Sequence, residues 1–230
     1  GAPVRGLRRR PGGWRVVVGA SRDEEAVDVD AVVLAVPAAP AARLLAGVCP
    51  EAARELSEVD YASVAVVTFA FPRAAVAGRL TGSGFLVPPI ERRTVKAATY
   101  STNKWHWLDQ AAPDLALVRA SVGRYGEAAE LQRDDAELVA GALADLRAAT
   151  GVGGTPADSR VTRWGGALPQ YTVGHPERMS RVRAAAGRLG TVAVCGAAYD
   201  GIGVPACIAS ASVAVAQVLA GLPARGTIGP

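Results

Sequence analysis

The chain has 230 residues, of which 50% are hydrophobic and 20% charged, and its formal net charge is +4. This length allows one or two domains that bury a sizeable core. The basic residues are scattered apart from the arginine triplet at 8–10, and aromatic residues are few. The composition therefore argues against a nucleic-acid-binding protein, which shows a basic stripe with stacking aromatic residues.

Three widely spaced cysteines, Cys49, Cys195 and Cys207, form no C-x-x-C pair and no cluster with histidine. This pattern indicates neither a zinc site nor a disulfide framework. We expect the cysteines to be small buried residues of a protein in a reducing compartment, and we expect no metal site.

The first part of the chain predicts short strands followed by short helices. Runs rich in valine and arginine flank the turn Pro11-Gly12-Gly13, as in a hairpin. We expect the acidic residues 23–25 to form a solvated loop. The expected strands are 4–10, 14–19 and 31–37, and the expected helices are 40–47 and 51–58.

From about residue 59 the pattern changes to several strands in succession, which is typical of an antiparallel sheet. Residues 63–71 alternate and are rich in valine, threonine and phenylalanine. A helical period follows at 133–150, with acidic residues near its start. The expected strands of this sheet are 63–71, 85–87, 95–101 and 115–122.

After a further strand at 160–164, the chain predicts two more helices. Residues 176–186 have the composition of a polar surface helix. The apolar run 205–222 contains two serines and a glutamine and is otherwise mostly small. It is a poor membrane span, so we expect a buried helix.

A strand, a glycine-rich turn and that last helix form the segment most suggestive of a site. Residues 191–195 are a short β-branched run, and Gly196, Gly201 and Gly203 let the backbone bend sharply. Pro205 suits the first turn of a helix. The helix start directs free N–H groups and a partial positive charge toward the glycines, which favours an electron-rich ligand atom. A segment needed only for folding would have the same spacing.

Two stretches of the chain resemble one enzyme family. Gly-Ala-Ala-Tyr-Asp-Gly-Ile-Gly-Val-Pro-Ala-Cys-Ile-Ala-Ser at 196–210 is similar to the C-terminal flavin-contacting segment of the FAD-dependent porphyrinogen oxidases of haem synthesis. Arg-Trp-Gly-Gly-Ala-Leu-Pro-Gln-Tyr-Thr-Val-Gly-His at 163–175 resembles the Trp…Ala-x-Pro-Gln-Tyr…Gly-His segment of the same family. The chain thus resembles the C-terminal half of a bacterial coproporphyrinogen III or protoporphyrinogen oxidase, within the flavin amine oxidase superfamily.

The resemblance implies a mixed α/β fold. It predicts the closing part of a Rossmann-like FAD-binding domain at 1–57 and 160–230, around an inserted antiparallel-sheet substrate domain at 58–159. The family binds the FAD pyrophosphate through a G-x-G-x-x-G motif near its N-terminus, and this sequence contains none. We therefore expect this chain to need the missing N-terminal half of the same enzyme as its partner. By itself it should be inactive and hold no FAD tightly.

The resemblance also assigns residues to the adenine end of FAD. Val4, in the segment that begins at Gly1, would place its backbone against the adenine. Plain strand packing is an equally good explanation for this valine. Residues 35–37 resemble the strand end that lies near the dinucleotide.

At the flavin end, the resemblance implies that Ile202, Gly203 and Val204 contact the pyrimidine edge of the isoalloxazine ring. Trp164 would lie beside the flavin, or else fill the core. The complete set of expected cofactor-binding residues is Val4, Trp164, Gly196, Ile202, Gly203, Val204 and Pro205.

The substrate implied by the resemblance carries propionate carboxylates, so cationic partners are expected. Lys104 could bind a carboxylate while Trp105 faces the planar ring, and a surface loop is the alternative interpretation. Arg73, Arg92 and Arg93 are further cationic candidates. His175 has either a structural role or a substrate contact. No catalytic side chain is identified, because the cofactor carries the hydride chemistry.

The function implied is oxidation of coproporphyrinogen III to coproporphyrin III in haem biosynthesis, with FAD as hydride acceptor and O2 as final oxidant, in the cytoplasm. The expected partners are the porphyrinogen, O2 and a ferrochelatase-type enzyme of the pathway, and no nucleic acid. The alternatives are a protoporphyrinogen IX oxidase, another flavin amine oxidase-like enzyme, and an inactive fragment that acts as a binding module.

Overall fold

The computed structural model describes residues 2–20 and 22–223, and it divides the chain into two compact units. Unit 1 combines residues 1–60 with 169–230, and unit 2 is residues 61–168. From the sequence we placed the boundaries after residues 57 and 159. The second boundary falls later because the strand expected at 160–164 runs from Asp158 to Pro169 and stays in the sheet of unit 2.

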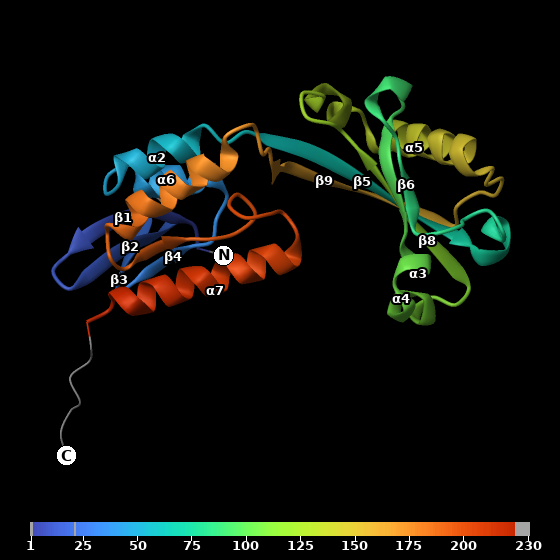
Figure 1. Ribbon diagram of the computed structural model, residues 1–230. Coiled ribbons are helices and arrows are strands. Elements are labelled where there is room, and N and C mark those ends of the chain that lie inside the picture. The colour runs from blue at the N-terminus through green and yellow to red at the C-terminus, as the bar shows by residue number, and fades with distance from the viewer. Residues whose placement is uncertain (1, 21, 224–230) are drawn as a thin grey trace, which may run out of the picture. The chain divides into compact units, whose positions relative to one another are not determined.

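Unit 1 begins with an antiparallel sheet of β1 (Val4–Arg10), β2 (Gly13–Ala20) and β3 (Asp23–Val29), so the expected hairpin is confirmed (Figure 1). The loop expected at 23–25 is wrong, because these residues belong to the edge strand β3. Asp28 of β3 lies opposite Arg15 of β2 and accepts a 2.8 Å hydrogen bond from its Nε. An edge strand keeps acidic side chains in solvent, so pairing with β2 overrides their low strand propensity.

A second sheet of unit 1 joins two segments that are far apart in the sequence. β4 (Val32–Leu34) and β10 (Val192–Val194) pair in parallel, with Val32 opposite Val192. Trp14 of β2 is buried, and its indole N–H donates to Thr191 Oγ1 at 2.9 Å. Because parallel strands end at the same edge, residues 35–37 after β4 and the turn after β10 leave the sheet at the same edge.

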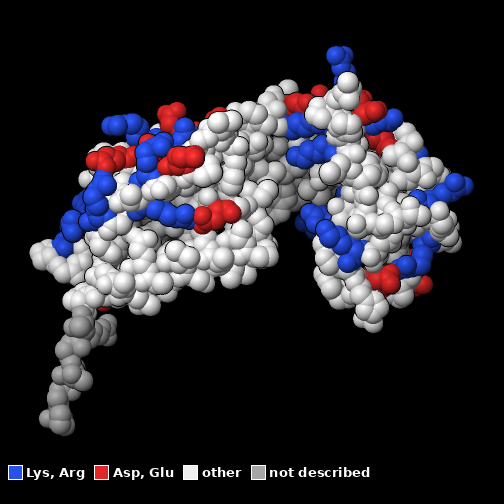
Figure 2. Space-filling model, in the orientation of Figure 1, with Lys and Arg blue, Asp and Glu red and all other residues white. Residues whose placement is uncertain are grey.

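Three helices complete the core of unit 1. Leu45, Leu56 and Met179 are almost fully buried there. Arg181 makes a two-pronged contact with Glu55, at 2.7 and 2.9 Å, and so links two of the helices. Acidic and basic side chains lie close together over this part of the surface (Figure 2). The helices are α1 (Ala38–Leu45), α2 (Pro50–Ser57) and α6 (His175–Gly187).

The last helix, α7 (Val204–Gly221), is less buried than expected. Only Ser210, Ala214 and Val218 of this helix are buried, because β4 and β10 cover a single stripe of it. The rest of its surface is uncharged (Figure 2). By length and composition α7 is apolar enough to cross a membrane, with a mean hydropathy of 1.7. That property is weak evidence, since core helices of soluble proteins share it.

Unit 2 is built on a five-stranded sheet in the order β6-β7-β8-β5-β9. The registers β5 to β8, β8 to β7 and β7 to β6 are all antiparallel, as the sequence predicted. Helix α5 (Asp135–Thr150) packs on one face, where Leu138, Ala142 and Leu146 meet the buried side chains of the sheet. The strands are β5 (Tyr61–Pro72), β6 (Gly84–Leu86), β7 (Val95–Tyr100), β8 (Leu115–Val122) and β9 (Asp158–Pro169), and two short helices, α3 (Ser101–Lys104) and α4 (His106–Ala111), lie between β7 and β8.

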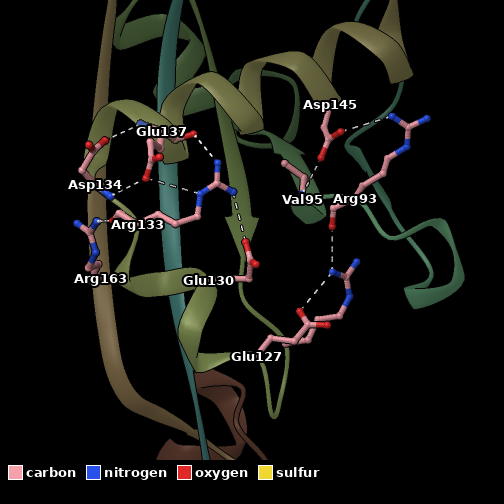
Figure 3. Close-up of polar contacts among 10 residues, drawn as sticks. Arg93, Val95, Glu127, Glu130, Arg133, Asp134, Glu137, Asp145 and Arg163 are labelled. Carbon is pink, nitrogen blue, oxygen red and sulfur yellow. Dashed lines mark hydrogen bonds and ion pairs between the residues drawn. The ribbon is translucent and has the colours of Figure 1, made fainter.

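Polar contacts cap the start of α5 and tie its later part to the sheet (Figure 3). Asp134 caps the helix: its carboxylate accepts the Glu137 N–H at 2.8 Å, and the Glu137 carboxylate accepts the Asp134 N–H in return. Farther along, Asp145 accepts the Val95 N–H of β7 at 3.0 Å and pairs with Arg93 at 3.4 Å. The charged groups of this face are therefore used to fix the helix.

Candidate functional site

The turn after β10 requires glycine at two positions. The Cys195 N–H still donates to the Leu34 carbonyl at 3.1 Å, and the chain then leaves the sheet. Gly196 has φ of 117° and Gly201 has φ of 140°, values that side chains rarely tolerate. A Cβ on Gly201 would also lie 3.0 Å from the Cβ of Ala206. These two glycines therefore shape the turn that leads into α7.

Gly203 is different, because its conformation is ordinary. It is the N-cap of α7, with φ of −73°, and a Cβ placed on it would meet only Pro205 Cδ at 3.8 Å. No side chain caps this helix, and Pro205 occupies its first turn. The N–H groups of Val204 and Ala206 have no partner within the helix because they belong to its first turn. The open space beside Gly203 is therefore next to free hydrogen-bond donors.

The surroundings of these donors fit a flavin. Ile202 and Val204 are 58% and 72% exposed, so apolar side chains flank the helix start. A Cβ on Gly196 would meet nothing within 4 Å, which leaves room for a planar group beside the turn. The electron-rich edge of an isoalloxazine ring matches N–H donors and the positive end of a helix. The expected residues Gly196, Ile202, Gly203, Val204 and Pro205 all lie in this turn and the start of α7.

Two aromatic residues, one just before α6 and one at its start, hold this turn in place. The Tyr171 hydroxyl donates to the Ala197 carbonyl at 2.7 Å. His175 Nε2 lies 2.8 Å from the Ala198 carbonyl, and the imidazole stacks on the Tyr171 ring with centroids 4.0 Å apart. His175 is 2% exposed, so its environment favours the structural role over the substrate contact. Tyr171 was not among the expected site residues, although it is the tyrosine of the Pro-Gln-Tyr motif.

The charged residue of the turn, Asp200, also has a partner. Arg183 of α6 donates to the Asp200 carboxylate, and this hydrogen bond holds the pKa of the Asp200 carboxyl below its usual range. The carboxylate is thus already occupied, which suits a residue that positions the turn rather than a base. Burial raises the pKa of the Cys195 thiol, so Cys195 is not an activated nucleophile.

A separate pocket in unit 1 brings together the two segments expected near the adenine. This pocket has a volume of about 570 Å³. Val4 is 46% exposed, and Val36, which follows β4, lines the same pocket. Gly1, with which the resembling segment begins, lies outside the described residues. The pocket is lined by Ala2, Pro3, Val4, Arg5, Val36, Pro40, Arg43 and Leu44.

The remaining expected residues lie in unit 2. Trp164 on β9 is 54% exposed and lines a small pocket of about 120 Å³ with Ser63 and Val64, so it is not a core tryptophan. The Lys104 ammonium lies 5.1 Å from the centre of the Trp105 ring. These two residues lie at the junction of α3 and α4 rather than in a loop.

Two of the three arginines expected as further substrate ligands form ion pairs within unit 2. Arg73 contacts Asp109 at 2.6 Å and several backbone carbonyls, and Arg93 pairs with Asp145. Within the described residues, no group of three or more His, Cys, Asp or Glu side chains is arranged to hold a metal ion.

Known proteins are similar to this chain in sequence and in fold. Coproporphyrinogen III oxidase of Mycobacterium tuberculosis is 41% identical over 196 residues, covering 85% of this chain and 42% of that protein. Protoporphyrinogen oxidase of Bos taurus is 30% identical, covering 95% of this chain and 46% of that protein. A crystal structure from Exiguobacterium sp. 255-15, provisionally assigned as a protoporphyrinogen oxidase, superposes with a TM-score of 0.77 at 30% identity over 95% of this chain and 46% of that one.

These similarities also define how much of a longer protein the chain represents. It spans less than half the length of the curated relatives described above. The family described as flavin containing amine oxidoreductase matches residues 1–219, which is nearly the whole chain. The family match identifies the cofactor class as a flavin, as the resemblance implied. The chain belongs to the flavin-containing amine oxidoreductase family.

Proposed function

We propose that this chain is part of an FAD-dependent porphyrinogen oxidase of haem biosynthesis, which oxidises coproporphyrinogen III to coproporphyrin III with O2 as the final acceptor. The observation that carries the proposal is the uncapped start of α7, where free N–H groups and open space lie between exposed Ile202 and Val204. The identity of 41% to a coproporphyrinogen III oxidase supports the choice of substrate.

In this proposal the chain binds and orients the cofactor at two places. The pocket at Val4 and Val36 accepts the adenine, and the start of α7 accepts the electron-rich edge of the ring system. When bound, a flavin accepts hydride from the substrate and passes the electrons to O2. The Val204 and Ala206 N–H groups stabilise negative charge at that edge, because they point along the positive end of the helix dipole.

The apolar side chains have a second role. Ile202 and Val204 flank the donors with apolar surface, and a ring bound against them would shield the hydrogen bonds from water and strengthen them in the lower local dielectric. Tyr171 and His175 keep the turn from moving by binding consecutive carbonyls, Ala197 and Ala198. No side chain of this site is assigned as an acid or base.

Oxygen-free mixing tests the reaction class. The intact enzyme, loaded with FAD, is mixed with coproporphyrinogen III, and the visible flavin absorbance is followed. The proposal predicts rapid bleaching by the porphyrinogen and none by a primary amine. Bleaching by the amine alone would favour the flavin amine oxidase alternative instead.

A protoporphyrinogen IX oxidase is the second candidate, because the Bos taurus relative carries that name and is 30% identical. We place coproporphyrinogen III first because that name belongs to the relative with the higher identity. An inactive fragment that acts as a binding module remains the alternative outside enzymes. An open reading frame with a G-x-G-x-x-G motif directly upstream of this sequence would argue against it.

We also propose partners and a location for the enzyme. The missing N-terminal half of the same enzyme supplies the pyrophosphate-binding loop, and a ferrochelatase-type enzyme of the pathway follows as a partner. We propose a cytoplasmic location. We also propose no nucleic-acid partner, since on the face that Figure 2 shows the charges are mixed rather than gathered in a basic stripe.

A further inference from the structure

One face of the sheet in unit 2 carries an arginine that nothing in the unit neutralises. Helix α5 covers the face that contains Val95, Ala98, Val118 and Val122. Side chains alternate along a strand, so the intervening residues of β7 and β8 point to the opposite face. Arg119 of β8 is among them, and it is exposed.

The strand registers show what surrounds Arg119 on that face. Thr68 of β5 and Thr99 of β7 lie directly opposite it on its two neighbouring strands. Side chains in such positions are about 5 Å apart at Cβ. Two threonine side chains therefore flank Arg119 on that face, and small or apolar residues make up the rest of the neighbourhood, namely Val66, Ala70, Leu86, Ala97, Leu117 and Ser121.

No acidic residue is available on these strands. The sequences of β5, β6, β7 and β8 contain no Asp or Glu at all. Other arginines of unit 2 do form ion pairs within the described residues, as Arg73 does with Asp109, Arg93 with Asp145 and Arg163 with Asp135. The Arg119 side chain has no such contact with any described residue. An arginine held among threonines and apolar side chains is a ready partner for a carboxylate from outside.

An exposed aromatic residue lies on β9, an edge strand of the same sheet. Trp164 is 54% exposed and lines a small pocket together with Ser63, Val64 and Leu131. The sheet that carries Arg119 thus also presents an exposed indole, which suits a planar aromatic acid.

Resting on the proposed function, we propose that Arg119 is a substrate-binding residue that forms a charge-assisted hydrogen bond with a propionate carboxylate of the porphyrinogen, assisted by Thr68 and Thr99. The occupant of this open face, opposite α5, is thus a planar, carboxylate-bearing ring. Arg119 was not among the expected site residues, because in the sequence it is simply the charged residue of the strand expected at 115–122.

The test uses the intact flavin-loaded enzyme with Arg119→Leu, Arg119→Lys and the control Arg79→Leu. Arg79 is another exposed arginine of unit 2, but it lies beside Gly151 at the end of α5 rather than on the open face. The probes are coproporphyrin III, whose binding is followed by its visible absorbance, and its tetramethyl ester in the same detergent. Flavin content and melting temperature verify that each variant is folded.

We expect Arg119→Leu to weaken binding of the free acid about tenfold or more while binding of the ester stays as in the wild type. Arg119→Lys should recover part of the loss, and Arg79→Leu should change nothing. Equal losses for acid and ester, or no loss for the acid, would overturn the role of Arg119. If the wild type itself neither binds coproporphyrin III nor oxidises a porphyrinogen, the proposed function fails instead.

Discussion

His175 and Ala198 are joined by a 2.8 Å contact between the imidazole Nε2 and the backbone carbonyl. This contact connects the first residue of α6 to the turn that follows β10, and the imidazole is almost fully buried. A buried polar group that loses its partner costs about 1–3 kcal/mol. The position of the candidate flavin site therefore depends on a histidine that lies outside that site.

His175→Leu should lower the free energy of unfolding by about 1–3 kcal/mol, because the Ala198 carbonyl loses its partner. Flavin content of the intact enzyme should fall with it. Urea unfolding followed by tryptophan fluorescence, with flavin absorbance, measures both. Tyr171→Phe is the matched control: it removes only the hydroxyl of a residue that is 43% exposed and should cost less. A His175→Leu enzyme as stable as wild type would show that the contact does not position the turn.

Gly203→Val should separate binding from folding. The new Cβ meets only Pro205 Cδ at 3.8 Å and φ is −73°, so the apoprotein should stay folded while flavin content drops sharply. Gly201→Ala should instead destabilise the fold itself, since φ of 140° and a 3.0 Å approach to Ala206 would strain the turn. Flavin absorbance and thermal melting of both variants decide the matter. Full flavin occupancy in Gly203→Val would mean that the helix start is structural only.

The Arg183–Asp200 pair predicts a pH dependence. The pKa of Asp200 is lowered in the folded protein, so the pair contributes stability above the unfolded value of about 3.9 and loses it as pH falls through the folded pKa. Asp200→Asn should therefore destabilise the protein at neutral pH, and its difference from wild type should shrink below about pH 4. The side chains are 32% and 42% exposed, so the difference should not exceed about 1 kcal/mol. Urea unfolding across pH measures it, and a gap that grows on acidification would contradict the assignment.

Lys104→Met should raise KM for coproporphyrinogen III more than for protoporphyrinogen IX, because the first substrate carries four propionates and the second only two. The exposed ammonium lies over the Trp105 ring and is not ion-paired with any described residue. A charge-assisted hydrogen bond is worth about 1.5–3 kcal/mol, which corresponds to about tenfold or more in affinity, with kcat nearly unchanged. Steady-state assays with both substrates measure the ratio. Equal effects on the two substrates would remove Lys104 from the site.

The strands and helices of this chain could largely be predicted from the sequence, because their boundaries depend on local patterns. The run at 115–122 alternates and is bounded by turn residues, and β8 has the same limits. The capping residues Asp134 and Glu137 likewise mark the start of α5. Residues 23–25 were expected to form a loop, because their strand depends on pairing with β2 and no local pattern indicates that pairing.

Features that depend on distant partners could not be predicted in the same way. The burial of α7 depends on which elements pack against it, and within residues 2–20 and 22–223 only β4 and β10 do so extensively. The glycines of the turn were recognised, but only the structure distinguishes Gly201, which needs a positive φ, from Gly203, which does not. The isolation of Arg119 becomes visible only when four strands are set in register.

The most direct test of the proposed function is the ratio of kcat/KM for coproporphyrinogen III to that for protoporphyrinogen IX. The intact FAD-loaded enzyme is assayed in air by the appearance of porphyrin fluorescence, with O2 consumption recorded in parallel. With both substrates under identical conditions, the proposed function predicts a higher kcat/KM for coproporphyrinogen III. It also predicts that O2 is consumed in step with porphyrin formation. Oxidation of neither porphyrinogen by an enzyme that retains its flavin would contradict it.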